Sequence, residues 1–430
     1  MKNSSFEFLE IRFVDITGDP KMMTVPLEKK YATLDEVASD RVFKEGVNID
    51  GSSVQGFSKI QDSDLILELD QQSLFEVPYV EMAGKAAVQC YIFKDGLPFE
   101  GDTRAHLFNT LKELKEKYRL RFFVGPEPEF FLIQDDKPVD KGKYADVYPS
   151  SLSSGLIKQF SIDLRTAGIR TNISHHEVGK GQYEIELQFE DGLRTADTVV
   201  TYKNLIKALA LKRDLQATFM PKPFEEDNGS GMHCHVSLWN DETNLFAGEE
   251  KHEISETALH FIAGLLKHAP ALSAIVAPTI NSYKRLVPGY EAPVYISWAK
   301  RNRSCLVRIP FFRDKKGARI EFRCPDPSCN PYLAFAAIVV AGMDGISKKM
   351  EPPEPVEGIN LYEMSPTELE QKGIMVLPTN LEKALEALER DNIILDSLPP
   401  HIAREFLAAK WAEWQEYNTK VTDWEWTRYF

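Results

Sequence analysis

The feature that most constrains the fold is a set of four short segments in which charged and apolar residues alternate. They span residues 127–131, 184–187, 233–237 and 319–323. Side chains two positions apart on a β-strand lie on the same face, so each segment predicts a strand with one charged face. We expect these strands to form one curved antiparallel sheet whose apolar back is covered by helices, which is an α+β architecture.

The chain is long enough for two domains. Its 430 residues exceed the size at which a single hydrophobic core stops growing. Short alternating stretches up to about residue 93 predict a small, mostly β domain, and turn residues gather at 94–102. We therefore divide the chain into residues 1–98 and 99–430.

Helices are expected in the second part, from apolar periodicity and capping residues. Asp102 precedes an apolar stripe that runs from Leu107 to Tyr118, and a second stripe, 152–164, ends before Gly168. Asn330 followed by proline predicts the start of an apolar helix. The string SPTE at 365–368 has the capping-box pattern.

Composition argues against several classes of protein. A formal net charge of -14 disfavours binding to a nucleic-acid backbone. The first residues carry no secretory signal pattern, and the apolar stretch at 334–343 is too short to span a bilayer. Five scattered cysteines without zinc-finger spacing predict reduced thiols and a cytoplasmic location.

The charged faces of the four strands carry the candidate chemistry. Carboxylates that converge without cations would repel one another, so Mg²⁺ or Mn²⁺ bound by oxygen ligands and one imidazole is the natural solution. The alternative, that each glutamate lies on a separate solvated face, stays open on alternation alone. The candidate residues are Glu127, Glu129, Glu177, Glu184, His233 and Glu321.

Arginines crowd into one stretch of this acidic chain, between residues 285 and 323. Guanidinium groups bind carboxylate and phosphate in a bidentate manner, so metals together with arginines predict phosphoryl transfer to an anionic substrate. The sequence contains no P-loop, dinucleotide or kinase motif, so a nucleotide would be held by this sheet and its metals.

Several strings, in order along the chain, resemble type I glutamine synthetase, in particular its shorter alpha subgroup. They are NIDGSS (48–53), GPEPE (125–129), HHEV (175–178), GQYE (181–184), NGSGMHCH (228–235), NSYKRLVPGYE (281–291), RNR (301–303) and RIEFR (319–323). The resemblance implies an N-terminal β-grasp domain, a larger catalytic domain and ATP-dependent ligation of ammonia to L-glutamate through a γ-glutamyl phosphate.

The resemblance also implies a role for individual residues. One metal would be held by Glu129, Glu177 and Glu184, and the other by Glu127, His233 and Glu321. Glutamate would be held by Glu129, Asn228, Gly229, His233, Arg285 and Arg323, and ATP by Phe189, His235, Ser237, Arg303, Arg308 and Lys316. Ammonium would lie near Asp50, Ser53, Tyr144 and Glu177, with Asp50 as the base and Glu291 on a loop that closes over the site.

In the family, Asp50 and Ser53 reach the active site of a neighbouring subunit. Twelve subunits form two stacked hexameric rings, and the aromatic tail that includes Trp424 and Phe430 docks into the opposite ring. The resemblance therefore implies a homo-dodecamer. The sequence leaves open whether a regulatory protein binds this chain.

The chain departs from the family pattern at four places. Lys59 stands where many alpha members have an arginine for glutamine feedback, and the residues after Tyr362 differ from the adenylylation site of other members, so we predict neither device. Asn172 and Tyr183 replace residues that are common beside the nucleotide and beside Glu184. Two alternatives remain: a ligase that uses a larger amine, and a silent structural relative.

Overall fold

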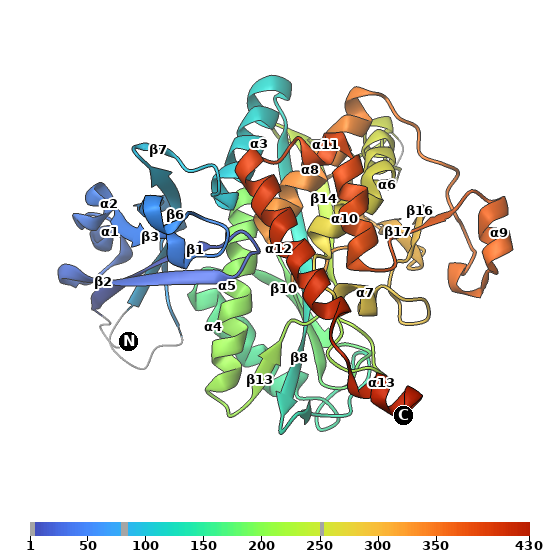
Figure 1. The fold of residues 1–430 in the computed structure, drawn as a ribbon, viewed down its shortest axis with the longest axis horizontal. Helices are drawn as coiled ribbons and strands as arrows, with labels where there is room; N and C mark the ends of the chain where they lie inside the picture. The colour runs from blue at the N-terminus through green and yellow to red at the C-terminus, as the bar shows by residue number, and fades with distance from the viewer. Residues whose placement is uncertain (1–4, 79–84, 250–252) are drawn as a thin grey trace.

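The computed structural model describes residues 5–78, 85–249 and 253–430. An N-terminal β-sheet, blue in Figure 1, lies at one side of a larger part that contains most of the helices. The C-terminal helices, drawn in red, run back across the larger part and end far from the N-terminus.

The N-terminal sheet is mixed, with the strand order β2-β1-β6-β4-β3. Its two central strands, β1 and β6, are parallel, and the other pairs are antiparallel. This arrangement is the expected β-grasp domain, and its own apolar cluster includes Leu9, Ile11 and Val88. The elements are β1 (Phe6–Val14), β2 (Pro20–Tyr31), α1 (Leu34–Val37), α2 (Val42–Glu45), β3 (Val47–Asp50), β4 (Asp64–Leu69), β5 (Phe75–Glu76), β6 (Lys85–Lys94) and β7 (Leu97–Pro98).

The second sheet has the main order β10-β11-β8-β14-β18-β17-β16-β19. It was expected to be antiparallel throughout, but β16 and β17 are parallel, so the sheet is mixed. Alternation cannot distinguish the two directions, because it depends only on which face each residue occupies. The strands are β8 (Arg121–Gln134), β9 (Lys137–Pro138), β10 (Thr171–His176), β11 (Gln182–Leu187), β12 (Glu190–Asp191), β13 (Gln216–Thr218), β14 (Met232–Asn240), β15 (Thr243–Asn244), β16 (Tyr295–Lys300), β17 (Cys305–Ile309), β18 (Ile320–Phe322) and β19 (Met375–Val376).

The predicted apolar back of this sheet is the main hydrophobic core. Cys234 and Val236 from β14, Ile185 from β11 and Ile320 from β18 are fully buried in one cluster together with residues of the helices. The helices are α3 (Thr103–Tyr118), α4 (Lys158–Thr166), α5 (Gly192–Leu211), α6 (Glu256–Val276), α7 (Ser282–Arg285), α8 (Pro331–Ser347), α9 (Pro366–Gln371), α10 (Leu381–Arg390), α11 (Asn392–Leu395), α12 (Pro400–Asn418) and α13 (Asp423–Tyr429).

The helix ends follow the capping residues of the sequence. The side chain of Asp102 accepts hydrogen bonds at the start of α3, Asn330 does the same for α8, and Ser365 forms the predicted capping box of α9. All five cysteines are free and buried, as expected. In the described part of the chain only α6 is long and apolar enough to cross a membrane, and most of it is buried in the core.

Arg104 on α3 joins the two domains. Its guanidinium donates to Asp70 of the N-terminal domain at 2.6 Å and to both carboxylate oxygens of Asp197 on α5 at 2.8 and 2.9 Å. The guanidinium also lies 4.4 Å from the centre of the Tyr91 ring. Arg104 is only 4% exposed, so two carboxylates depend on one buried cation.

Replacing this cation should be strongly destabilising. We expect Arg104→Ala to lower the free energy of unfolding by about 3–5 kcal/mol, because two carboxylates would lose their buried partner. Urea unfolding measures the change, with the exposed Arg165→Ala as the matched control. A loss below about 1 kcal/mol would contradict the role of Arg104.

A buried histidine joins three C-terminal segments. His268 on α6 faces Asp391, before α11, at 2.5 Å through Nδ1 and Asp344 on α8 at 3.0 Å through Nε2. Burial alone would lower the pKa of His268, but these two hydrogen bonds outweigh burial and raise it. Both ring nitrogens face carboxylates, an arrangement that favours the doubly protonated imidazolium.

The stabilisation from His268 should depend on pH. It is fully present below the pKa of an unfolded histidine, about 6.5, and declines as pH rises through the higher folded pKa. The difference in unfolding temperature between wild type and His268→Gln should therefore be largest at about pH 6 and shrink in alkaline buffer. Scanning calorimetry over this range provides the test, and a difference that grows with pH would refute the charged state.

Candidate active site

Strand register brings the predicted charged residues to one place. His233 on β14 pairs with Glu127 on β8, and Glu129 pairs with Glu184 on β11. On the other side, Glu321 on β18 pairs with both His235 and Arg308. The four alternating segments are thus neighbouring strands of one sheet, and their charged faces form a continuous surface.

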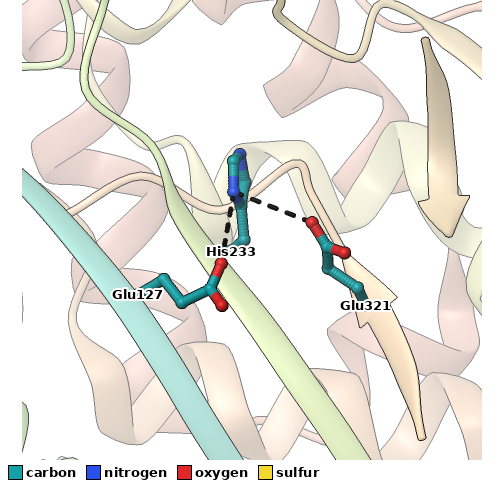
Figure 2. A group of neighbouring side chains, drawn as sticks. All are labelled: Glu127, His233 and Glu321. Carbon is teal, nitrogen blue, oxygen red and sulfur yellow. Dashed lines mark ion pairs between the residues drawn. The ribbon is translucent and has the colours of Figure 1, made fainter. Parts of the chain in front are cut away.

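The first acidic group combines Glu127, His233 and Glu321. In Figure 2 the Nδ1 atom of His233 points toward both carboxylates, 3.7 Å from Glu127 Oε2 and 3.8 Å from Glu321 Oε1. These separations are too long for hydrogen bonds. Burial and the nearby Arg323 lower the pKa of His233 to about 4, which leaves the imidazole neutral.

The second group consists of Glu129, Glu177 and Glu184. One oxygen of each carboxylate lies within 4.8 Å of the others. Burial and repulsion by Glu177 and Glu184 raise the pKa of Glu129 well above its usual value, and burial also raises the pKa of Glu184. Gly231 N and Gln182 Nε2 donate to the same oxygen of Glu129, at 3.0 and 2.8 Å.

Both groups fit divalent cations. Oxygen ligands at about 2.0–2.6 Å from Mg²⁺, Mn²⁺ or Ca²⁺ are themselves a few ångströms apart, as they are here. A neutral imidazole is the form that binds metal. A cation among Glu129, Glu177 and Glu184 would offset the mutual repulsion of these three carboxylates. The donor set, five carboxylates and one imidazole, suits hard cations rather than zinc.

Arginines balance part of this negative charge. Glu321 is fully buried and accepts from Arg323 Nη1 at 2.7 Å and from Arg308 Nε at 2.5 Å, one bond to each carboxylate oxygen. Burial alone would raise the pKa of Glu321, but Arg323 and other nearby cations lower it to about 2. Arg285 is held by its own bonds to the carbonyl oxygens of Cys324 and Arg323.

These groups line a cavity of about 320 Å³. A neighbouring cavity of about 230 Å³ shares Glu127, Glu186, His235 and Arg319 with the first. Of the residues predicted for the site, the first cavity contains Glu127, Glu129, Tyr144, Glu177, Glu184, Asn228, Gly229, His233, His235, Arg285, Glu291, Arg303, Arg308, Glu321 and Arg323. The second contains Phe189, His235, Ser237 and Lys316.

The loop that carries Glu291 borders the first cavity. Glu291 has a φ of 57°, a backbone conformation that is uncommon for a residue with a side chain. Two hydrogen bonds hold it there: Arg323 Nη2 donates to the Glu291 carbonyl at 3.4 Å, and the Tyr362 hydroxyl donates to the Ala292 carbonyl at 2.8 Å. The loop backbone at Glu291 and Ala292 is thus tied to Arg323 and Tyr362.

Asp50 and Ser53 line neither cavity. They lie at the end of β3 in the N-terminal domain, and both are exposed. Asp50 accepts from Ser52 N, Ser52 Oγ and Ser53 Oγ at 2.9, 2.7 and 3.1 Å, and the bonds from Ser52 lower its pKa. The expected ammonium pocket is therefore incomplete within one chain.

Several residues of the first cavity have no role that the sequence predicted. Gln182 and Glu186 share the strand face of Glu184, and Arg319 shares that of Glu321, so alternation contained a signal for all three. No such signal exists for Tyr290, which lies in a loop. The residues without an assigned role are His175, Gln182, Glu186, Tyr290, Arg319 and three others, Gly231, Ala292 and Pro310.

Models of two domain families match the chain. The model described as "Glutamine synthetase, beta-Grasp domain" matches residues 5–95, and "Glutamine synthetase, catalytic domain" matches residues 100–429. Among curated relatives, the glutamine synthetase of Methanocaldococcus jannaschii is 46% identical, over 100% of this chain and 96% of its own length. That of Pyrococcus horikoshii is 47% identical, over 99% and 96%.

Solved structures agree with the sequence relatives. A GmaS/ADP complex has a TM-score of 0.88 and 32% identity, covering 99% of this chain and 97% of the other. The glutamine synthetase of Plasmodium falciparum has a TM-score of 0.86 and 25% identity, covering 100% and 97%. With both domain models and full-length relatives in agreement, the chain belongs to the glutamine synthetase family.

Proposed function

We propose that this chain is a glutamate–ammonia ligase that uses ATP to convert L-glutamate and ammonia into L-glutamine, ADP and phosphate. The observation that carries the proposal is the pair of acidic groups on neighbouring strands, bordered by arginines and open to a second cavity. Such a site can bind an anionic amino acid beside a nucleoside triphosphate. The full-length glutamine synthetase relatives support the same reaction.

We assign two Mg²⁺ or Mn²⁺ ions, one to Glu129, Glu177 and Glu184 and one to Glu127, His233 and Glu321. When bound, these ions neutralise charge that develops on the transferred phosphoryl group. His235 supports the second set, because its Nε2 lies 2.7 Å from Glu127 Oε1 and Arg319 Nε donates to its Nδ1 at 3.2 Å.

Glutamate is assigned to the first cavity. Arg323, which also pairs with Glu321, and Arg285, which donates to backbone carbonyls, are buried at this cavity and complement the carboxylates of the substrate. Asn228 and Gly229 form one polar wall of this cavity, and Glu129 and His233 form another.

ATP is assigned to the second cavity, with its phosphates directed toward the first. Phe189, half exposed, offers an apolar surface for the base, and Ser237 and Lys316 lie nearby. The side-chain carboxylate of glutamate attacks the γ-phosphorus and ADP leaves, so a γ-glutamyl phosphate forms. Arg303 and Arg308 offset the negative charge of this step, and the Glu291 loop keeps water away from the acyl phosphate.

The last step requires a second subunit. Asp50 is held in its ionised form by hydrogen bonds and is exposed on the N-terminal domain, so it is available to a neighbouring chain. There it would accept a proton from ammonium, beside Ser53 of its own chain and Tyr144 and Glu177 of the other. Ammonia then attacks the acyl carbon, and phosphate leaves.

We further propose the assembly and organisation that accompany this reaction. Twelve copies would form two stacked rings, and the exposed aromatic side chains of α13, such as Trp424 and Trp426, would dock into the opposite ring. The domains would divide at residues 1–98 and 99–430. Five buried free thiols support a reducing cytoplasmic location.

Removing Asp50 should abolish the response to ammonium. We expect Asp50→Ala to reduce ammonium-stimulated phosphate release by about 10²–10⁴-fold, because a proton acceptor is lost. Release is measured with glutamate, ATP and Mg²⁺, with glutamine quantified alongside, and the exposed Asp35→Ala is the control. Wild-type release that responds to putrescine and not to ammonium would instead identify a ligase for a larger amine.

Mixed assemblies test the shared site. Asp50→Ala and Arg303→Ala subunits should each be inactive alone, because each lacks one half of every site. Co-assembly at equal amounts should restore about a quarter of wild-type activity, since random neighbours complete that share of sites. Recovery of no activity in verified mixed assemblies would refute a site built from two chains.

The cluster of Glu129, Glu177 and Glu184 should destabilise the metal-free protein and stabilise the protein when Mg²⁺ is bound. Without divalent cations, Glu177→Gln should be more stable than wild type, because it relieves repulsion among three buried carboxylates. With saturating Mg²⁺, wild type should gain about 2–3 kcal/mol, as expected at about 100 times the dissociation constant, and the variant clearly less. Thermal unfolding with EDTA or Mg²⁺ measures both effects, with the exposed Glu226→Gln as control. Equal Mg²⁺ stabilisation of both proteins would contradict the assignment of Glu177.

A further inference from the structure

A carboxylate outside the assigned site, with a side chain that is 9% exposed, collects an unusual number of hydrogen bonds. Asp140 lies after β9, in the segment that leads toward β10, and its two oxygens accept five of them. Five bonds exceed the roughly four lone-pair positions of a carboxylate, so Asp140 is saturated. The donors are His176 Nε2 at 2.8 Å, Gly142 N at 3.2 Å, Gly181 N at 3.1 Å, Leu152 N at 3.1 Å and the hydroxyl of Tyr183.

These bonds close the neck of a loop at residues 140–152. Gly142 and Leu152 lie near its two ends, and both donate to the same carboxylate. A third bond ties the loop to β10 and runs from Ala145 N to the carbonyl of His176 at 2.9 Å. A Cβ atom at Gly142 would lie 2.6 Å from the ring of His176, so the loop approaches the strand as closely as a glycine allows.

The same network lies directly behind the acidic site. His176 pairs with Tyr183 across β10 and β11, and the next pair along the ladder is His175 with Glu184. The first pair is fully buried, whereas the second borders the cavity. Consecutive residues of a strand face opposite sides, so β10 and β11 place the loop neck on one side of the sheet and the residues of the site on the other.

The loop places Tyr144 at the wall of that cavity. The ring of Tyr144 meets the imidazole of His175 edge-on, with centroids 5.1 Å apart. His175 in turn lies 3.3 Å from Glu184 and 3.5 Å from Glu177. Tyr144 is 51% exposed, so among the described residues its ring contact with His175 and the neck of its loop are what direct it.

We propose that Asp140, His176 and Tyr183 are positioning residues that set the place of Tyr144 and thereby the size of the amine that the site accepts. This inference rests on the proposed ligase function. Ammonia is the smallest amine, and a wall held by a saturated hydrogen-bond network leaves no room for a larger one. Loosening the network lets the loop and Tyr144 move outward, which weakens ammonium binding and admits a methyl group.

The test is Tyr183→Phe, which removes one donor to Asp140 and keeps the packing of the ring against His176 and Phe130. Tyr31→Phe is a matched control, because Tyr31 is also buried and donates to Asp40 at 3.1 Å, in the N-terminal domain. We expect Tyr183→Phe to raise the KM for ammonium about tenfold, with little change in the KM for glutamate or ATP.

Amine selectivity is the decisive measurement. The ratio of kcat/KM for methylamine to that for ammonium should rise in Tyr183→Phe and stay at the wild-type value in Tyr31→Phe. This ratio does not depend on the fraction of folded enzyme, so a loss of stability leaves the test valid. In a Tyr144→Ala background the effect of Tyr183→Phe should vanish, because the network acts through Tyr144.

Two results would overturn the inference: an unchanged amine ratio, or an undiminished effect of Tyr183→Phe in the Tyr144→Ala background. Failure of the proposed function gives a different result, since wild type would then release no phosphate in response to ammonium.

Discussion

Repulsion among buried carboxylates is the constraint on which the rest of this structure depends. One oxygen of each of Glu129, Glu177 and Glu184 lies within 4.8 Å of the others, and Glu127 and Glu321 lie on β8 and β18, on either side of β14. The raised pKa values of Glu129 and Glu184 mean that full ionisation of the group is energetically unfavourable. Arginines neutralise the negative charge of Glu321 at one side of the cluster. Divalent cations would neutralise the carboxylates at the other side.

A cluster of this kind needs a rigid support. The strand ladder fixes the backbone of each ligand, and the opposite face of the same strands is buried against helices in the main core. Repulsion at the front therefore acts against a large apolar area at the back. The N-terminal domain is fastened to this core through Arg104, which links Asp70 to α5. Asp50 thus projects from a domain whose orientation is held by a buried ion pair.

In the proposed mechanism, one chain alone is insufficient. The two cavities together contain the residues expected for glutamate, metal and nucleotide, yet the proposed proton acceptor is exposed elsewhere. The tethered loop at 140–152 borders the side of the cavity near Tyr144, where the proposed amine would enter. Selectivity among amines would then depend on two separate supports: Asp50 from a neighbour and Tyr144 from the chain itself.

Sequence alone determined the division into a small β part and a larger part with both strands and helices, the capped helices and the charged strand faces, because these depend on local periodicity and capping. The motifs also identified the family. Only the tertiary structure decided which strands are neighbours, that β16 and β17 are parallel, and that Asp140 joins loop and hairpin. These features arise from contacts between residues far apart in the chain, and alternation records the face of a strand but neither its direction nor its partner.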